Sequence, residues 1–95
     1  MTKFKVGDSV EIIALPKLLF ARKEEEGAGV MSLPGTVFIN VLRQYGKHGT
    51  VVKVDETKQD PYQIRYLSPE SFTEDGSGSG GFCNLLLDLN DSHLK

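Results

Sequence analysis

The sequence predicts a mainly β protein: a small, strongly bent barrel of about five strands, with a partly helical insertion after the first strand. Three observations support this prediction. Apolar and polar residues alternate over residues 9–14, a glycine opens a β-branched run at residues 49–55, and further strand-forming residues follow at 61–67. Short strands separated by turn residues are typical of small barrels, which remove exposed sheet edges by closing the sheet.

The first strand is expected near the N-terminal end of the sequence. Val10 and Ile12 occupy alternate positions, and a Gly-Asp pair beginning at Gly7 precedes them as a turn signal. Pro16 follows a few residues later and cannot donate a hydrogen bond to a neighbouring strand. The first strand is therefore expected to end before Pro16.

Residues 16–45 form the expected insertion. Residues 17–26 contain good helix formers but end in three glutamates, which is unfavourable at the C-terminus of a helix dipole, so a short helix and a mobile loop both stay open. Residues 34–45 favour a helix with Ser32 as N-cap and Gly46 after its end, although alternating β-branched residues keep a strand open. The side chains expected to face the barrel are Leu33, Val37, Val41 and Leu42.

Three more strands are expected at residues 49–55, 61–67 and 82–89. A polar loop of hairpin length joins the first two. Before the third lies a segment rich in glycine and serine, residues 74–81, whose composition is typical of a flexible loop. Alternation along the strands predicts a core that contains Val10, Ile12, Val52, Val54, Ile64 and Leu86.

The length of 95 residues indicates one domain, residues 1–95. The net charge is −2, with +3 in residues 1–54 and −5 in residues 55–95, and this balance disfavours binding to nucleic acid, which usually needs a basic surface. No apolar run approaches the roughly 20 residues of a membrane helix, and the N-terminus has no apolar stretch typical of a secretory signal. We therefore expect a cytoplasmic protein without membrane association, in which the single cysteine, Cys83, forms no internal disulfide.

No catalytic or metal motif stands out. The G-x-G-x-x-G spacing that begins at Gly76 precedes a strand-forming run and not the helix that a dinucleotide site needs. His48, His93 and Cys83 lack the spacing of a metal site. The Ser-His pair at residues 92–93 has no value as a triad by adjacency alone. The sequence predicts no enzyme activity, no cofactor and no metal.

Several segments resemble SH3-like barrels. Residues 4–12 are similar to the x-V-G-D-x-V-x-I opening of many such barrels, and residues 45–55 resemble the glycine-centred second strand of KOW-type and MIB/HERC2-type domains. Residues 61–66 resemble their third strand, and residues 91–94 resemble the closing turn and final strand. The resemblance implies an SH3-like five-stranded barrel of the kind found in small bacterial and phage proteins.

These observations together favour a non-enzymatic binding module that engages a protein partner through residues 16–48. The insertion is unusually apolar, and KOW-like domains often contact RNA or proteins at the turn that follows it here. We expect that a short linker in place of residues 17–45 would leave a folded barrel that no longer binds. Two alternatives stay open: a KOW-like nucleic-acid-associated module and a small-ligand-binding, sponge-like protein. The residues predicted to contact the partner are Leu19, Phe20, Arg43, Tyr45, Lys47, His48 and Lys53.

Overall fold

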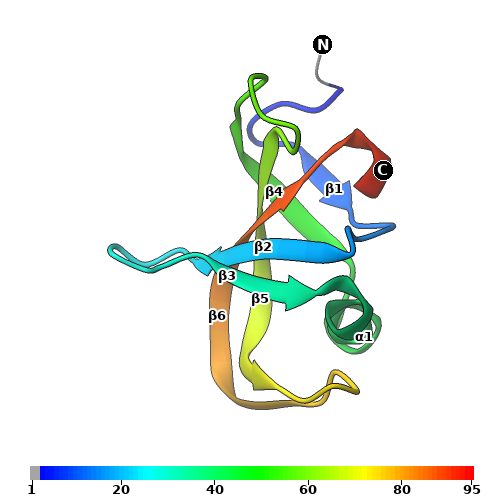
Figure 1. Cartoon of the computed structure of the whole chain (residues 1–95), viewed down its shortest axis with the longest axis vertical. Helices are drawn as coiled ribbons and strands as arrows, with labels where there is room; N and C mark the ends of the chain where they lie inside the picture. Colours follow the sequence, from blue (N-terminus) through cyan, green and yellow to red (C-terminus); the bar gives the residue numbers. More distant parts are fainter. Residues whose placement is uncertain (1–2) are drawn as a thin grey trace.

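The computed structural model describes residues 3–95, and these residues form one antiparallel sheet of six strands with a single α-helix (Figure 1). The strand order is β1-β4-β5-β6-β2-β3. A mainly β fold is thus confirmed, but with six strands where about five were expected, and no strand pairing joins the outer strands β1 and β3. The elements are β1 (Ser9–Glu11), β2 (Leu18–Lys23), β3 (Met31–Pro34), α1 (Gly35–Tyr45), β4 (His48–Val54), β5 (Tyr62–Phe72), β6 (Gly78–Leu89) and the 3-10 helix η1 (Asp91–His93).

The first half of the insertion is a β-hairpin, so the short helix considered for residues 17–26 is wrong, and the loop considered as the alternative is restricted to the residues after Lys23. Leu19 and Ala21 are buried, whereas Leu18 and Phe20 on alternate positions are exposed. β2 pairs with β3 on one side and with β6 on the other, where Ala21 lies opposite Leu87. These long-range pairings outweigh the helix propensity of the segment.

The second half of the insertion is helical, as predicted. The helix begins at Gly35, after Pro34, and no side-chain cap is formed, so Ser32 is not the N-cap. The amide of Gly46 donates to the carbonyl of Leu42 and closes the other end. Val41 and Leu42 are buried as expected, while Leu33 and Val37 are only half-buried. The largest buried side chain of the helix is Phe38, whose ring packs edge-on against Tyr66 and Phe72.

The insertion belongs to the core of the domain. α1 packs against β3 and β5, and the hairpin β2–β3 lies across the ribbon of β5 and β6 (Figure 1). Because this segment supplies a third of the buried apolar cluster, we expect, contrary to the prediction from the sequence, that a chain with a short linker in place of residues 17–45 would not fold. The core residues that it contributes are Leu19, Ala21, Phe38, Val41 and Leu42.

A β-bulge in β4 shifts the predicted core. Val51 lies opposite Ile64 and Lys53 opposite Gln63, so Val52 is the extra residue on its strand. Val51 is therefore buried, at 1% exposure, and Val52 is only half-buried, which corrects the register expected from alternation. Of the other predicted core residues, Val54 is half-buried and packs against the core, and those that are buried are Val10, Ile12, Ile64 and Leu86.

The bulged register predicts that alanine substitutions at two neighbouring valines differ in their effect on the free energy of unfolding. Val51→Ala should lower the free energy of unfolding by about 2 kcal/mol, because it removes two buried methyl groups and leaves a cavity. Val52→Ala serves as the matched control and should cost less than about 1 kcal/mol at its half-buried position. Urea denaturation of both variants measures the difference. Equal losses, or a larger loss at Val52, would contradict the bulged register.

The C-terminal end closes over the first strand. After η1, Leu94 forms an antiparallel bridge with Ile12, and Glu11 and Lys95 exchange two backbone hydrogen bonds. The hydroxyl of Tyr62 donates to Asp91 over 2.6 Å and accepts from the amides of Lys3 and Phe4. The closing turn and final strand expected for residues 91–94 are thus a 3-10 turn followed by a single bridge.

His93 makes stability depend on pH in the neutral range. Its Nδ1 accepts from the backbone amide of Asn90, and burial lowers the pKa of the imidazole against a smaller opposing effect of Asp60. The unfolded chain then binds a proton more readily than the folded one, so this contribution is complete above about pH 6.5 and is lost as pH falls below it. We expect His93→Asn, whose side-chain oxygen can accept the same hydrogen bond, to flatten this dependence in denaturation curves. His48→Asn, at an exposed site, should leave it unchanged.

The glycine-rich segment is more ordered than its composition suggests. Gly78–Gly81 belong to β6, in which Gly78 and Ser79 pair with Phe72 and Ser71 of β5, so the loop expected at residues 74–81 is restricted to its first half. The tip of this hairpin is tied to α1 by side-chain donors. Asn40 donates to the carbonyl of Glu74, and Gln44 donates to that of Asp75. The hairpin therefore curves beneath α1 and is fixed to it (Figure 1).

Candidate functional site

Three elements converge on one exposed apolar cleft. The end of α1 supplies Tyr45, β5 supplies Leu67 and β6 supplies Phe82, and these side chains are 38%, 59% and 56% exposed. We call this site the aromatic cleft. It has a volume of about 460 Å³, and its lining residues are Tyr45, Gly46, His48, Tyr66, Leu67 and Phe82.

Hydrogen bonds and ring packing hold the aromatic cleft in shape. The rings of Tyr45 and Phe82 pack edge to face, with centroids 5.8 Å apart. The hydroxyl of Tyr45 accepts from the amide of Gly78, and that of Tyr66 donates to the carbonyl of Gly46 over 2.7 Å. Burial raises the pKa of Tyr66 to about 12, so this hydroxyl remains a donor at neutral pH. The cleft is thus preorganised around neutral aromatic groups.

A shallow groove extends the aromatic cleft along the outer face of the sheet. It shares His48 and Leu67 with the cleft and reaches Arg65 and Asn84. Arg65 donates to both carboxylate oxygens of Glu24 over 2.8 and 2.9 Å from its Nε. This hydrogen bonding lowers the pKa of the Glu24 carboxyl and raises that of Arg65. The charges of Arg65 and Glu24 therefore cancel in the middle of this face of the sheet.

A second hollow lies farther along the same face, and we call it the cationic pocket. Arg22 from β2, Lys53 from β4 and Lys58 from the following turn line it together with Asp88. Its volume is about 310 Å³. Burial raises the pKa of the Asp88 carboxyl, while Lys58 and Arg22 act in the opposite direction and Asp60 adds to the rise. The pocket thus places three cations around one carboxylate.

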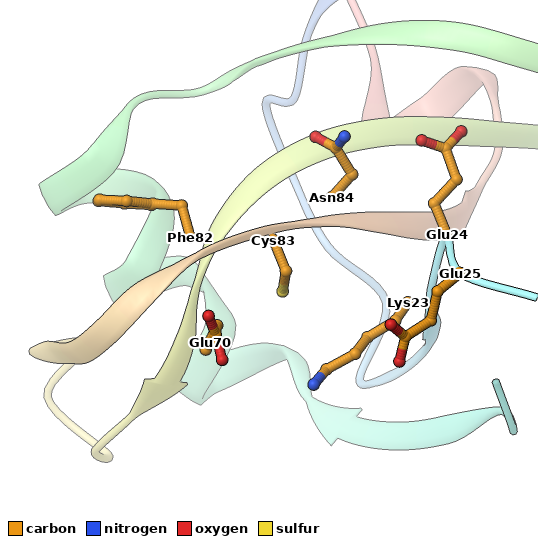
Figure 2. A pocket seen from close by; sticks show the side chains of 7 residues that line it. All are labelled: Lys23, Glu24, Glu25, Glu70, Phe82, Cys83 and Asn84. Carbon is orange, nitrogen blue, oxygen red and sulfur yellow. The ribbon is translucent and has the colours of Figure 1, made fainter.

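A third hollow follows the edge of β6 where β2 ends, and we call it the edge pocket (Figure 2). Cys83, Lys23 and Glu70 lie on one side of β6, whereas Phe82 and Asn84 point to the other side (Figure 2). Burial raises the pKa of the Cys83 thiol, which opposes formation of the reactive thiolate. The volume is about 470 Å³, and the lining residues are Lys23, Glu24, Glu25, Glu70, Phe82, Cys83 and Asn84.

The structure separates the residues that the sequence grouped as partner contacts. Tyr45 and His48 meet in the aromatic cleft, and Lys53 lies in the cationic pocket. Leu19 is completely buried, so it cannot contact a partner. Phe20 is exposed on β2, outside the three hollows described above. The two remaining residues are exposed at the end of α1 and the turn after it: Arg43 and Lys47.

The outward-facing residues of the cleft were missed in the sequence. Leu67 and Phe82 were interpreted only as parts of strands, where an apolar residue usually indicates the core. The position of Leu67 in the strand pattern does indicate that its side chain faces outward. Leu67 is out of phase with the buried residues Ile64 and Tyr66, because it follows Tyr66 directly on the opposite face.

The catalytic arrangements considered in the sequence are not formed. Ser92 donates its hydroxyl to Asn90, and His93 accepts from the Asn90 amide, so the serine and histidine share no hydrogen bond. Within residues 3–95, no group of three or more His, Cys, Asp or Glu side chains is placed to hold a metal ion. The glycines from Gly76 onward lead into β6 and not into a helix. In the same part of the chain, no helix is long and apolar enough to cross a membrane.

Comparison of the chain with protein-family models, with curated proteins and with solved structures gave no significant match.

Proposed function

We propose that this protein is a non-enzymatic binding module that engages a protein partner through the aromatic cleft. The observation that carries the proposal is the gathering of three large exposed side chains, Tyr45, Leu67 and Phe82, around one preorganised hollow. Exposed apolar clusters on small domains mark interaction sites, and aromatic residues dominate the energetics of protein interfaces. Tyr45, Gly46 and His48 of the cleft belong to the region favoured by the sequence, residues 16–48, whereas Leu67 and Phe82 come from β5 and β6.

The chemistry of the aromatic cleft suits a peptide surface. His48 is its only titratable side chain apart from the two tyrosines, and the tyrosine hydroxyls are occupied by backbone groups. A partner would therefore bury apolar area against Leu67 and Phe82, with polar contacts at the rim supplied by Lys47 and His48. A central apolar patch with a polar rim is the usual anatomy of such interfaces.

We also propose that the domain is an SH3-like barrel with a large insertion. Two features support this proposal: β4 starts directly after a short turn, and the C-terminal residues return through a 3-10 turn to bridge Ile12 beside β1. Those features agree with the resemblance of residues 45–55 and 91–94 to SH3-like barrels. The hairpin β2–β3, added to the edge of β6, would be the part that such barrels lack.

Affinity capture with matched variants tests the proposed function. The double variant Leu67→Ser/Phe82→Ser should lose at least tenfold in affinity for a captured partner, because interface hot spots are worth about 1.4 kcal/mol or more each. Val6→Ser/Ile13→Ser removes exposed apolar residues outside the cleft and is the control. Both doubles should keep the melting temperature of the native chain. Equal affinity of the two doubles would refute the cleft as the binding surface.

A second candidate function is association with nucleic acid, and the observation that favours it is the cationic pocket. Arg22, Lys53 and Lys58 could neutralise phosphates on the face that also carries the aromatic cleft. Under this alternative, Lys53→Ala weakens binding to a single-stranded oligonucleotide and reduces its salt dependence. The net charge of −2 makes us expect no such binding at physiological salt.

A further inference from the structure

We propose that the N-terminal half of β6 binds an extended segment of the partner as an added strand, in which apolar and basic residues alternate. This inference rests on the proposed function, since it names the kind of protein segment that the module takes. β6 is twelve residues long, but only Leu85–Leu87 pair with β2. In the part of the chain that the structure describes, Ser79, Phe82 and Cys83 pair with β5 and with no other strand, and Gly80 and Gly81 lie at an irregularity in that pairing.

The backbone of Phe82 faces this open edge. The carbonyl of Asn84 accepts from the amide of Glu24, the residue directly after β2, so the backbone groups of Asn84 point away from β5. Backbone groups two residues apart in an antiparallel strand point to the same side. The N–H and C=O of Phe82 therefore point outward as well. Its partner in β5 is Pro69, which has no amide to donate to it.

The edge has one protective feature, the irregularity at Gly80 and Gly81, but its exposed residues 79–82 include no lysine, proline or other charged side chain. Natural sheet edges carry lysine, proline or inward-pointing charges, which prevent pairing with another chain. Ser79, Gly80, Gly81 and Phe82 are all exposed and uncharged. The two glycines leave the backbone open to close approach. Such an edge pairs with an extended peptide through main-chain hydrogen bonds, and alternate side chains of that peptide decide the specificity.

The two sides of β6 differ in chemistry, and this difference defines the added strand. On the side of Phe82, alternate residues of a bound peptide would meet the aromatic cleft, which favours apolar side chains. On the other side they would meet the edge pocket (Figure 2), where Glu25 and Glu70 outnumber Lys23 and the remaining carboxylate, Glu24, is paired with Arg65. Charge complementarity there favours lysine or arginine.

The probe for the test is a capped hexapeptide of alternating valine and lysine. Added to the isotopically labelled full chain, it should shift the amide resonances of Ser79, Phe82 and Cys83 and slow hydrogen exchange at the Phe82 amide. A hexapeptide of alternating valine and glutamate should bind at least tenfold more weakly. Glu70→Lys should weaken binding of the lysine peptide, whereas Glu74→Lys, with the same change in charge outside the edge pocket, should not.

A pair of variants at one position isolates the backbone contact. Phe82→Ala removes the side chain and keeps the outward N–H, while Phe82→Pro removes both. Loss of one backbone hydrogen bond should make Phe82→Pro bind the lysine peptide about tenfold more weakly than Phe82→Ala.

Equal affinities of these two variants, or unchanged hydrogen exchange at the Phe82 amide of the native chain when the lysine peptide is added, would overturn strand addition. So would pairing of the edge with a second copy, detected as a dimer by analytical ultracentrifugation. If the native partner depends on Leu67 while Phe82→Pro behaves as Phe82→Ala, the proposed function stands and the added strand is refuted.

Discussion

Phe38→Ala is expected to lower the free energy of unfolding by about 3–5 kcal/mol, the range for deleting a buried aromatic ring from a core. The Phe38 ring is 0% exposed and packs edge-on against Tyr66 and Phe72, with centroids 5.6 and 5.7 Å away. Through these two rings Phe38 packs α1 against β5. Removing it leaves a cavity between the helix and the sheet, which the fixed backbone cannot close.

Urea denaturation, followed by circular dichroism, measures this loss. Val37→Ala lies one position earlier on the same helix and is half-buried, so it is the matched control and should cost less than about 1 kcal/mol. A domain of this size has a stability of only about 5–15 kcal/mol, so Phe38→Ala should leave it marginal. A loss below about 1 kcal/mol at Phe38 would mean that α1 is not part of the core.

Gly76→Ala should be nearly as damaging, at about 2–4 kcal/mol, because two independent costs add. Gly76 has a φ of +87°, a conformation that residues with a Cβ rarely adopt. A Cβ there would also lie 2.5 Å from the carbonyl carbon of Asn40 in α1, which is backbone and cannot turn away. The substitution must therefore move the hairpin tip off the helix and disturb the hydrogen bonds that Asn40 and Gln44 donate to it.

Gly27→Ala is the control for this second prediction. Gly27 has a similar φ of +81°, but nothing lies within 4 Å of the position of its Cβ. It should show only the conformational cost of about 1 kcal/mol. Equal effects of the two substitutions in thermal and urea denaturation would show that the hairpin tip is not locked against α1. A larger effect at Gly76 would show that the hairpin tip is packed rigidly against α1.

Local patterns in the sequence predict most of the strands but not their partners. The strands at 49–55 and 61–67 were found because alternation and turn residues are properties of neighbouring positions. Residues 17–26 were misread because what makes them a strand is pairing with residues 31–34 and 85–87. Val52 was assigned to the core because the alternation of apolar and polar residues in the sequence does not reveal a β-bulge.

The candidate site was predictable only in part, for related reasons. Tyr45 and His48 stand beside the turn that the sequence marks clearly with Gly46, and the structure places both in the aromatic cleft. Leu67 and Phe82 come from strands far along the chain, and only the fold brings them to the end of α1. The glycines of residues 74–81 indicated flexibility by composition, but contacts with α1 fix the first of them, Gly76.

The most direct measurement is a hydrogen-exchange footprint of the native chain with and without its captured partner. Amides around the aromatic cleft, at Tyr45, Leu67 and Phe82, should become protected when the partner binds. Those beside Leu18 and Phe20 on the outside of β2 should exchange at an unchanged rate. Protection confined to β2, or to the cationic pocket around Lys53, would contradict the claim that the aromatic cleft is the binding surface of this protein.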